Sequence, residues 1–401
     1  MTTYFLMIIY MAFISLGLPD SLLGVAWPLI QSEYGSPFEA AGLVSMFIAG
    51  GTIVSSFAIG AVHKHLSTGK IALVSCLMTS LALLGFAFSP ALIWLLLFAI
   101  PLGLGAGSVD AALNNYVAIH YKAHHMSWLH CFWGIGATMG PIIMSRFIAE
   151  QNSWRGGYFT VSMIQLALAA LLFFTLPLWN RMAAEVHKSP VDLKADQKLQ
   201  AVSSHKTVGK TNSLNIKGVK LSLVSFLFYC GVESTMGLWG SSFLINVKEL
   251  SASSAAQWVS LYYGGITVGR LITGFITLKI SNRVLIRTGQ TVALAGVLLL
   301  LFPLPNSFSL IGFIMIGLGC APIFPCMLHE TPARFGKENS QAIMGYQMAL
   351  AYTGSTFLPP ILGFIAARTT IGLLPFFVLS YIIIMFISSE KINRVMIYHS
   401  Q

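Results

Sequence analysis

The sequence predicts an all-α polytopic membrane protein with twelve transmembrane helices. Of its 401 residues, 56% are hydrophobic and only 9% are charged, whereas soluble domains carry about 25% charged residues. A helix of about 20 mainly apolar residues spans a bilayer, and twelve segments meet that requirement. We expect spans at 4–30, 40–62, 70–89, 91–119, 127–149, 156–179, 218–245, 255–277, 284–302, 308–329, 340–366 and 371–389.

A polar stretch divides the twelve spans into two groups of six. It contains "EVHKSPVDLKADQKLQAVSSHKTVGKTNSLNIK", which is rich in lysine and poor in aromatic residues, the composition of a solvated linker. We therefore predict an N-terminal six-helix bundle at 1–180, a linker at 181–217 and a C-terminal six-helix bundle at 218–401. The first span has no basic region before it and no cleavage site, so we interpret it as a retained helix.

Lysine and arginine predict the orientation, because they are enriched in cytoplasmic loops. If the linker and both termini are cytoplasmic, eighteen of the 23 Lys and Arg residues lie on that side, and only Arg155, Lys248 and Arg368 lie outside. The other two, Arg146 and Arg270, lie within spans near their ends. We expect an integral protein of a bacterial cytoplasmic membrane with both termini cytoplasmic. The net charge of +10 then belongs to a membrane surface, and we expect no nucleic-acid partner.

The cysteines predict neither a disulfide nor a metal site. All five lie in apolar runs, and none forms a close pair with the spacing of a metal site. As small hydrophobic residues they fit helix interiors. The five are Cys76, Cys131, Cys230, Cys320 and Cys326.

Carboxylates inside the spans are the main functional signal. Asp20, Asp110 and Glu233 lie within spans 1, 4 and 7, and Glu330 lies at the end of span 10. A charge at the membrane centre is costly, and burial favours the protonated form of a carboxylate. An acid that titrates and faces each side in turn can carry a proton, so we expect Asp20 and Asp110 to serve proton coupling. The alternative for each acid is a fixed hydrogen bond between helices, and for Glu330 we expect pairing with a loop base.

Other polar and aromatic residues are candidates for holding a solute. Asn114 lies four residues after Asp110 and therefore on the same helix face, and a carboxylate beside an amide can hold sugar hydroxyls. Tryptophan can offer a flat apolar face to a sugar ring, although it also packs in helix interfaces. His130 is either a cavity ligand or a packed histidine. The candidate substrate-binding residues are Asn114, Asn115, His130, Trp133, Glu233, Trp239 and Gln347.

Glycine pairs predict where helices approach closely. Gly103 and Gly107 are four residues apart, as are Gly136 and Gly140, and small residues at that spacing allow close packing of membrane helices. We expect spans 2, 4, 5, 8 and 11 to pack in this way. The run "GLGAG" is not a dinucleotide-binding loop, because Ser108 stands where the third glycine is required and no strand precedes it.

Two six-span halves joined by a basic loop resemble the major facilitator superfamily over the whole chain. The resemblance implies that each half is an inverted pair of three-helix units and that the solute binds near the midplane between the halves. It also implies that spans 1, 4, 7 and 10 line the central cavity. Asp20, Asp110 and Glu233 fall in three of those four spans.

Four segments resemble the fucose–galactose–glucose:proton symporter family within that superfamily. They are "SLGLPDSLLGVAWPLI", "GAGSVDAALNNY", "WLHCFWGIGATMGP" and "YCGVESTMGLWGSSFL". The resemblance implies that Asp20 and Asp110 serve proton coupling and sugar binding and that Asn114 matches an asparagine of the family. His130 keeps a polar group, whereas Trp133 replaces a polar residue that helps to hold the sugar in family members.

The loop motif of the superfamily is partly present in both halves. "GAVHKHLSTGK" keeps Gly60 and Lys70 but has Lys64 where an acid is expected, and "GRLITGFITLKISNR" keeps Arg270. From this resemblance we expect Lys70 and Arg270 to act in gating, with Arg270 as a cytoplasmic gate or packing cation rather than a solute ligand.

These features predict a secondary active transporter that couples symport of a sugar or related polyhydroxylated solute to a proton gradient by alternating access. The expected partners are a small solute and the lipid bilayer, the protein is expected to be a monomer, and no cofactor is expected. The alternative is a proton-driven exporter of drugs or cationic metabolites on the same fold. An enzyme is not expected, because the sequence has neither a Ser-His-Asp nor a His-Glu-x-x-His arrangement.

Overall fold

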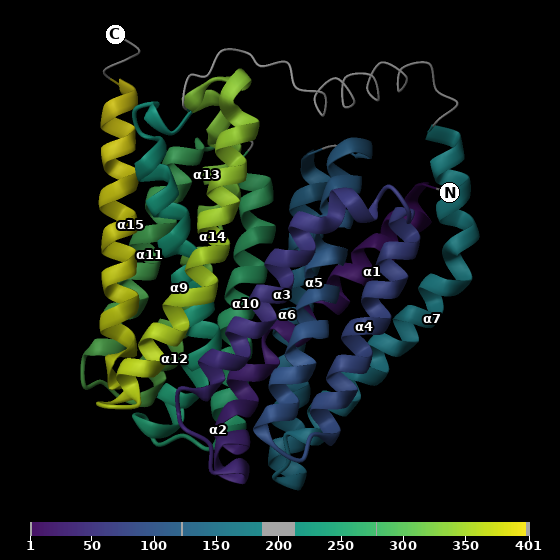
Figure 1. Cartoon of the computed structure of the whole chain (residues 1–401). Helices are drawn as coiled ribbons and strands as arrows, with labels where there is room; N and C mark the ends of the chain where they lie inside the picture. Colours follow the sequence, from purple (N-terminus) through teal and green to yellow (C-terminus); the bar gives the residue numbers. More distant parts are fainter. Residues whose placement is uncertain (1, 122, 187–212, 278, 398–401) are drawn as a thin grey trace.

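Helices crossing the molecule from end to end make up the structure (Figure 1). The computed structural model describes residues 2–121, 123–186, 213–277 and 279–397. Within these ranges, eleven helical segments are long and apolar enough to cross a membrane. The predicted linker, 181–217, lies largely outside the described residues.

The first six predicted spans correspond to helices of the N-terminal half. Span 1 is built from two helices in succession, α1 (Thr2–Asp20) and α2 (Leu22–Tyr34). Spans 2 to 6 are α3 (Ala40–Val62), α4 (Thr68–Phe88), α5 (Leu92–His120), α6 (Ala123–Gln151) and α7 (Arg155–Val186).

The C-terminal half repeats this plan with one divided span. Span 10 consists of α12 (Asn306–Cys320) and α13 (Ile323–Phe335), separated by Ala321 and Pro322. The other spans are α9 (Val219–Asn246), α10 (Ala252–Ile276), α11 (Asn282–Leu301), α14 (Lys337–Ala366) and α15 (Leu374–Ile397). Short 3-10 turns at Ser213–Asn215 and Ile371–Leu373 precede α9 and α15.

The predicted span 255–277 is helical, but its composition alone does not identify it as a membrane helix. It is α10, which is absent from the eleven candidate spans. Its sequence "ASSAAQWVSLYYGGITVGRLITGFI" contains serines, a glutamine and Arg270, which lower its hydropathy. Because α10 packs against α6, α9 and α12, protein covers much of the surface that lipid would otherwise contact.

Proline leaves backbone carbonyls free in several spans, and neighbouring helices satisfy one of them directly. Pro19 lies inside α1 and has no N–H to donate to the carbonyl of Ser15. The Nε2 atom of Gln165 in α7 donates to that carbonyl at 2.7 Å instead. A freed carbonyl in a membrane helix requires such a partner, so Gln165 stabilises α1 where Pro19 interrupts its hydrogen bonds.

Glycines allow pairs of helices to pack with their backbones in contact, as the sequence predicted. A Cβ atom on Gly103 of α5 would lie 1.9 Å from the Ile48 carbonyl oxygen of α3, and one on Gly136 of α6 would lie 2.0 Å from the Ile14 carbonyl oxygen of α1. The second half uses the same device, since a Cβ on Gly354 of α14 would lie 2.1 Å from the Leu227 carbonyl oxygen. These contacts fix spans 2, 4, 5 and 11 against their neighbours.

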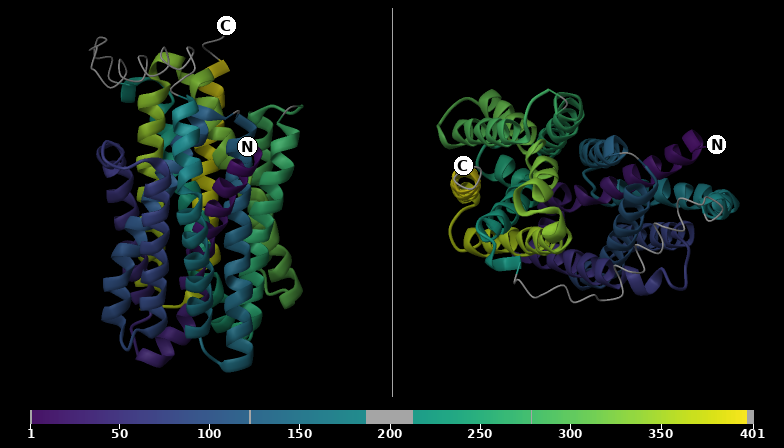
Figure 2. Two further views of the ribbon diagram at one scale, coloured as in Figure 1. Left: turned by 90° about the vertical axis from the view of Figure 1, so that its right-hand side faces the viewer. Right: turned by 90° about the horizontal axis from the view of Figure 1, so that it is seen from above.

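The two halves lie side by side, with α2, α3 and α6 of the first facing α9, α10 and α14 of the second (Figures 1 and 2). We call the end at which α7 ends and α9 begins the linker side. At the opposite end the halves are closely packed: Phe38 stacks on Trp239 with centroids 4.6 Å apart, and Arg368 lies 3.7 Å from Glu39. The end of the molecule away from the linker is therefore closed.

Candidate functional site

The three acids predicted from the sequence come together between the halves. Asp20 ends α1, Asp110 lies in α5 and Glu233 lies in α9. Asp20 interacts electrostatically with both of the other acids. It is also an exposed side chain at the end of a largely buried helix, so its carboxylate faces accessible space within the bundle.

Asp20 accepts a hydrogen bond from an aromatic side chain of the same half. The Nε1 atom of Trp133 in α6 donates to its Oδ2 atom at 2.7 Å. Gly17 makes this approach possible, because a Cβ there would lie 2.0 Å from the Trp133 carbonyl oxygen. Among the described residues, no cation lies within ion-pair distance of Asp20.

Asp110 is likewise held by a neutral donor. The Nδ2 atom of Asn114 donates to its Oδ1 atom at 2.9 Å, as the i, i+4 spacing suggested. The Oδ1 atom of Asn114 is buried without a partner in the described part of the chain. Across the boundary between the halves, Tyr352 of α14 interacts electrostatically with Asp110 and hydrogen-bonds Ser56 of α3.

Glu233 differs from the two aspartates because it has a cation partner. Its Oε2 atom lies 3.5 Å from Nη2 of Arg270 and accepts a hydrogen bond from the Tyr229 hydroxyl at 2.5 Å. The side chains of Arg270 and Glu233 are only 11% and 18% exposed. A guanidinium and a hydroxyl donor of this kind offset the cost of burying a carboxylate.

Arg270 lies within its span near the end, as the sequence analysis placed it, and its side chain belongs to this central group. Its guanidinium is beside Glu233 and stands over the ring of Trp133, 5.0 Å from the centroid. Arg270 is six residues from the end of α10, and its long side chain reaches inward to the carboxylate of α9. Packing against α9 and α6, which position along the chain does not reveal, decides this placement.

The other candidates divide into those near this group and those apart from it. His130 is near it, because its ring interacts electrostatically with Arg270 and meets Phe13 edge-on at 6.0 Å. Asn115, one residue beyond Asn114, is exposed, and the structure does not group it with the acids. Lys70 is exposed in the first turn of α4 on the linker side.

Trp239 and Gln347 are fully buried in packing between helices. The Nε1 atom of Trp239 donates to the Pro359 carbonyl at 2.7 Å. Gln347 donates to Ser222 at 2.8 Å and accepts from Thr331 at 3.0 Å. The structure does not place these two side chains with Asp20, Asp110 and Glu233.

Glu330 pairs with a base at the end of its span, which confirms its predicted role. Its Oε2 atom lies 2.6 Å from Nε of Arg334 and 3.8 Å from Nε of Arg283. The first pair lies within α13, and the second joins α13 to the start of α11. This acid stabilises the linker side of the C-terminal half rather than the central group.

Three tyrosines near the site were not singled out by the sequence analysis. Tyr263 meets the Trp133 ring edge-on at 6.4 Å, the Tyr262 hydroxyl donates to the Glu233 carbonyl oxygen at 3.3 Å, and Tyr352 faces Asp110. A polar hydroxyl in the middle of a span is the signal that could have found them, as the mid-span carboxylates were found. In the described residues no three His, Cys, Asp or Glu side chains converge as metal ligands would.

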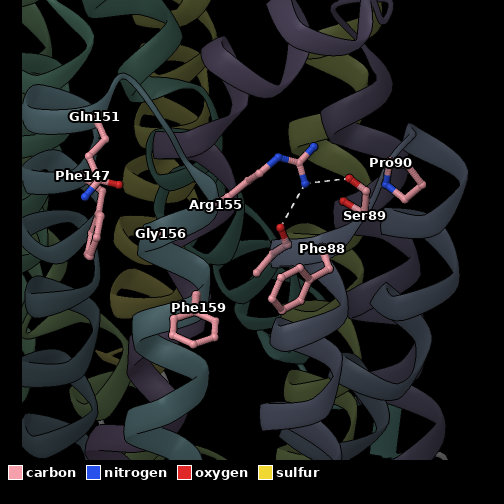
Figure 3. Close-up of a pocket in the computed structure, with 9 residues that line it drawn as sticks. Phe88, Ser89, Pro90, Phe147, Gln151, Arg155, Gly156 and Phe159 are labelled. Atoms are coloured by element: carbon pink, nitrogen blue, oxygen red, sulfur yellow. Dashed lines mark hydrogen bonds between the residues drawn. The ribbon is translucent and has the colours of Figure 1, made fainter.

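A pocket of about 590 Å³ lies elsewhere, at the end of the N-terminal half away from the linker (Figure 3). Phe88, Phe159 and Arg155 line it, together with the start of α7. Arg155 points across it to the end of α4 and donates to the Ser89 carbonyl at 2.7 Å. Since Nη2 of Arg155 also bonds Glu33 at 2.6 Å, the pocket contains a neutralised structural cation rather than the chemistry of the central acids.

The model of the Major Facilitator Superfamily matches residues 9–359. The chain belongs to this superfamily. Its members are transporters, so the chain is a membrane transporter of a small solute and not an enzyme. Solved structures confirm the fold: a D-xylose-proton symporter aligns with a TM-score of 0.74 and 12% identity, over 97% of this chain and 96% of that chain. An inward-facing bacterial homologue of the human lysosomal transporter Spinster aligns with a TM-score of 0.69 and 13% identity, over 98% and 96%.

Similarity to curated transporters is distant but extends over most of the chain. The glucose/mannose transporter GlcP of Bacillus subtilis is 24% identical, over 80% of this chain and 77% of its own length. A putative glucose/galactose transporter of Helicobacter pylori is 23% identical over 67% of this chain and 65% of its own length. The Bypass of stop codon protein 6 of Saccharomyces cerevisiae is 23% identical over 90% of this chain and 77% of its own length. Sugar transporters are thus among the relatives of this chain.

Proposed function

We propose that this transporter is a proton-coupled symporter of a sugar or related polyhydroxylated solute, related to the fucose–galactose–glucose:proton symporters. The observation that carries the proposal is that Asp20 and Asp110 each accept one hydrogen bond, from a neutral N–H group. An unpaired carboxylate in a membrane-spanning helix is costly and becomes less so when it takes up a proton. Asp20 and Asp110 are therefore the proton carriers of the proposal, and Glu233 with Arg270 is a fixed ion pair.

The solute of the proposal binds between the halves, beside these acids. Asn114, His130 and Trp133 supply an amide, an imidazole and a flat ring there, and hydroxyl groups of a sugar can bond to the first two. The glucose transporters among the relatives support this class of solute. In the membrane we expect both termini and the linker to be cytoplasmic, from the distribution of Lys and Arg.

An exporter of drugs or cationic metabolites is the second candidate. It is favoured by the electrostatic interaction of Asp20 with both other acids, of which only Glu233 has an ion-pair partner among the described residues. The two candidates separate in a thermal-shift screen of the purified protein against sugars, sugar alcohols and lipophilic cations. Stabilisation by a sugar, followed by uptake that rises with an inward proton gradient, supports symport, whereas stabilisation by cations alone supports export.

The decisive variant for proton coupling is Asp110→Asn. In proteoliposomes we expect it to lose accumulation of the sugar found in the screen against a gradient, because an amide cannot carry the proton. Exchange of labelled for unlabelled sugar, which requires no net proton movement, continues. The control is Glu150→Gln, since Glu150 forms an exposed pair with Arg146 at 3.0 Å on its own helix. Accumulation by Asp110→Asn at the level of the unmodified protein contradicts the proposed role.

A further inference from the structure

Trp133 is where the carboxylate of one half meets the ion pair of the other. Its indole N–H donates to Asp20 at 2.7 Å within the N-terminal half. Its ring face carries the guanidinium of Arg270 from the C-terminal half, with the guanidinium carbon 5.0 Å from the centroid. Arg270 is itself paired with Glu233. One side chain thus contacts both charged groups across the boundary between the halves.

Close helix packing on both sides of Trp133 fixes the indole in this position. A Cβ on Gly17 of α1 would lie 2.0 Å from the Trp133 carbonyl oxygen, and a Cβ on Gly134 would lie 2.4 Å from Oγ1 of Thr267 in α10. The backbone next to Trp133 is therefore in direct contact with α1 and α10. If the contacts of Trp133 become weaker, the expected result is therefore a separation of the two halves and not a movement of the Trp133 side chain alone.

The two interactions of the indole strengthen each other. A hydrogen bond from a neutral donor to an ionised carboxylate is roughly twice as strong as one between neutral groups. Such a bond polarises its donor and places more negative charge on the ring, and a cation over an aromatic face is held by that charge. Arg270 is therefore held more tightly when Asp20 is ionised than when it is protonated.

We propose that Trp133 is a positioning residue that transmits the protonation state of Asp20 to Arg270 and so sets how tightly the halves are joined at α6 and α10. The proposal rests on the proposed role of Asp20 in proton coupling. With Asp20 ionised, the contact between α6 and α10 is tight. With a proton on Asp20, the contact weakens and the halves separate more readily.

The other groups around Asp20 and Arg270 favour this division of roles. Asp110, Glu233 and Tyr263 interact electrostatically with Asp20 from α5, α9 and α10. Around Arg270 are Tyr229, Glu233 and the His130 ring. Glu233 holds Arg270 near the Trp133 ring whether or not Asp20 is protonated. Protonation of Asp20 therefore changes the strength of the contact between Arg270 and Trp133 but does not remove Arg270 from it.

The same trio of side chains occurs a second time in the molecule and provides a matched control. Trp154 donates to Oε2 of Glu33 at 2.6 Å, and the guanidinium carbon of Arg155 lies 4.5 Å from the Trp154 ring centroid. All three residues belong to the N-terminal half, where Arg155 borders the pocket of Figure 3. Replacing Trp154 removes the same two interactions without touching the boundary between the halves.

The test measures the separation of the halves by electron paramagnetic resonance and needs no solute. Spin labels are attached to cysteines that replace Gln151 in α6 and Ala367 after α14, both exposed at the end away from the linker, in a protein whose five native cysteines are replaced. Lowering the pH from about 8 to about 5 is expected to increase the ratio of the open to the closed population about ten-fold in this protein. That factor corresponds to a difference of about one unit between the pKa values of Asp20 in the two arrangements.

In Trp133→Phe, which keeps a ring but loses the N–H donor, this pH response is expected to shrink to less than about two-fold. Trp133→Tyr is the second such variant in case the first does not fold. Asp20→Asn is expected to give the open-to-closed ratio of low pH at every pH. Trp154→Phe is expected to keep the full response.

Three results overturn the proposal: an unchanged pH response in both Trp133 variants, an equal loss of response in Trp154→Phe, or no response in the parent protein. Failure of the proposed function has a different signature. If no proton-driven accumulation of any sugar occurs while the distance response depends on Asp20 and Trp133 as described, the coupling contact stands and the assignment of the solute falls.

Discussion

Glu233 and Arg270 are mutually dependent residues in the middle of the C-terminal half. Both side chains are largely buried and they lie 3.5 Å apart. Removing one partner of a buried ion pair leaves an uncompensated charge, which typically costs 3–5 kcal/mol, on the order of several hydrogen bonds. Replacing both together by apolar groups is far less costly.

We therefore expect Glu233→Gln and Arg270→Met each to lower the free energy of unfolding by about 3 kcal/mol. The double variant is expected to recover about half of the summed loss, because neither charge is then left alone. Thermal unfolding of the purified variants in detergent measures this. Additive losses in the double variant would show that the two side chains do not interact in the folded protein.

At this scale the sequence identified the acids but not their partners. Asp20, Asp110 and Glu233 could be found because a carboxylate in a long apolar segment is conspicuous, and Asn114 because i, i+4 residues share a helix face. The partnership of Trp133 with Asp20, and the inward position of Arg270, depend on which helices are adjacent. Neither follows from one span considered alone.

The glycines of α3 and α5 show how two elements are brought into contact. Gly103 meets the backbone of α3 directly, whereas a Cβ on Gly50, within α3 itself, would meet nothing within 4 Å. The two positions have the same residue type in adjacent membrane helices but opposite surroundings. Substitutions at Gly103 and Gly50 therefore separate the effect of helix–helix contact on stability from the effect of helix propensity.

Gly103→Ala is expected to destabilise the protein by about 1–3 kcal/mol, because the added methyl forces α5 away from α3. Gly50→Ala is expected to be neutral or to stabilise by up to about 1 kcal/mol, since alanine is the better helix former. The fraction of protein that remains monomeric after heating, determined by size-exclusion chromatography, measures the stability of both variants. Equal behaviour of the two variants would mean that α3 and α5 do not approach at Gly103.

The sequence predicted the elements of this fold well because hydropathy alone determines most spans. It placed a helix at 255–277, where α10 lies, by the same rule of about 20 mainly apolar residues, although α10 is absent from the eleven candidate spans. The breaks within spans 1 and 10 were not predicted. A break depends on whether a neighbour such as Gln165 satisfies the carbonyl freed by proline.

On the scale of the whole molecule, three of the contacts that join the halves close the end away from the linker. Phe38 with Trp239, Glu39 with Arg368 and Ser145 with Ser253 all lie away from the linker side. If the linker side is cytoplasmic, this arrangement is closed to the outside. The orientation in the membrane therefore determines which compartment the acids face.

Cysteine labelling in intact cells tests that orientation. A cysteine that replaces Gln151, at the end away from the linker, is expected to react with a membrane-impermeant maleimide. A cysteine that replaces Lys279, between α10 and α11, is expected to react only after the cells are opened. The reverse pattern would invert the topology derived from the Lys and Arg distribution.

The break between α1 and α2 has a consequence for how such a transporter changes access. Ser21 separates the two helices directly after Asp20, and α2 packs against α9 and α10, where a Cβ on Gly24 would meet the carbonyl oxygen of Gly237 at 2.2 Å. Span 10 has a matching break at Ala321 and Pro322. Each half therefore contains one jointed span, and we expect a change of access to bend these joints first, because the backbone there is not held by continuous helix hydrogen bonds.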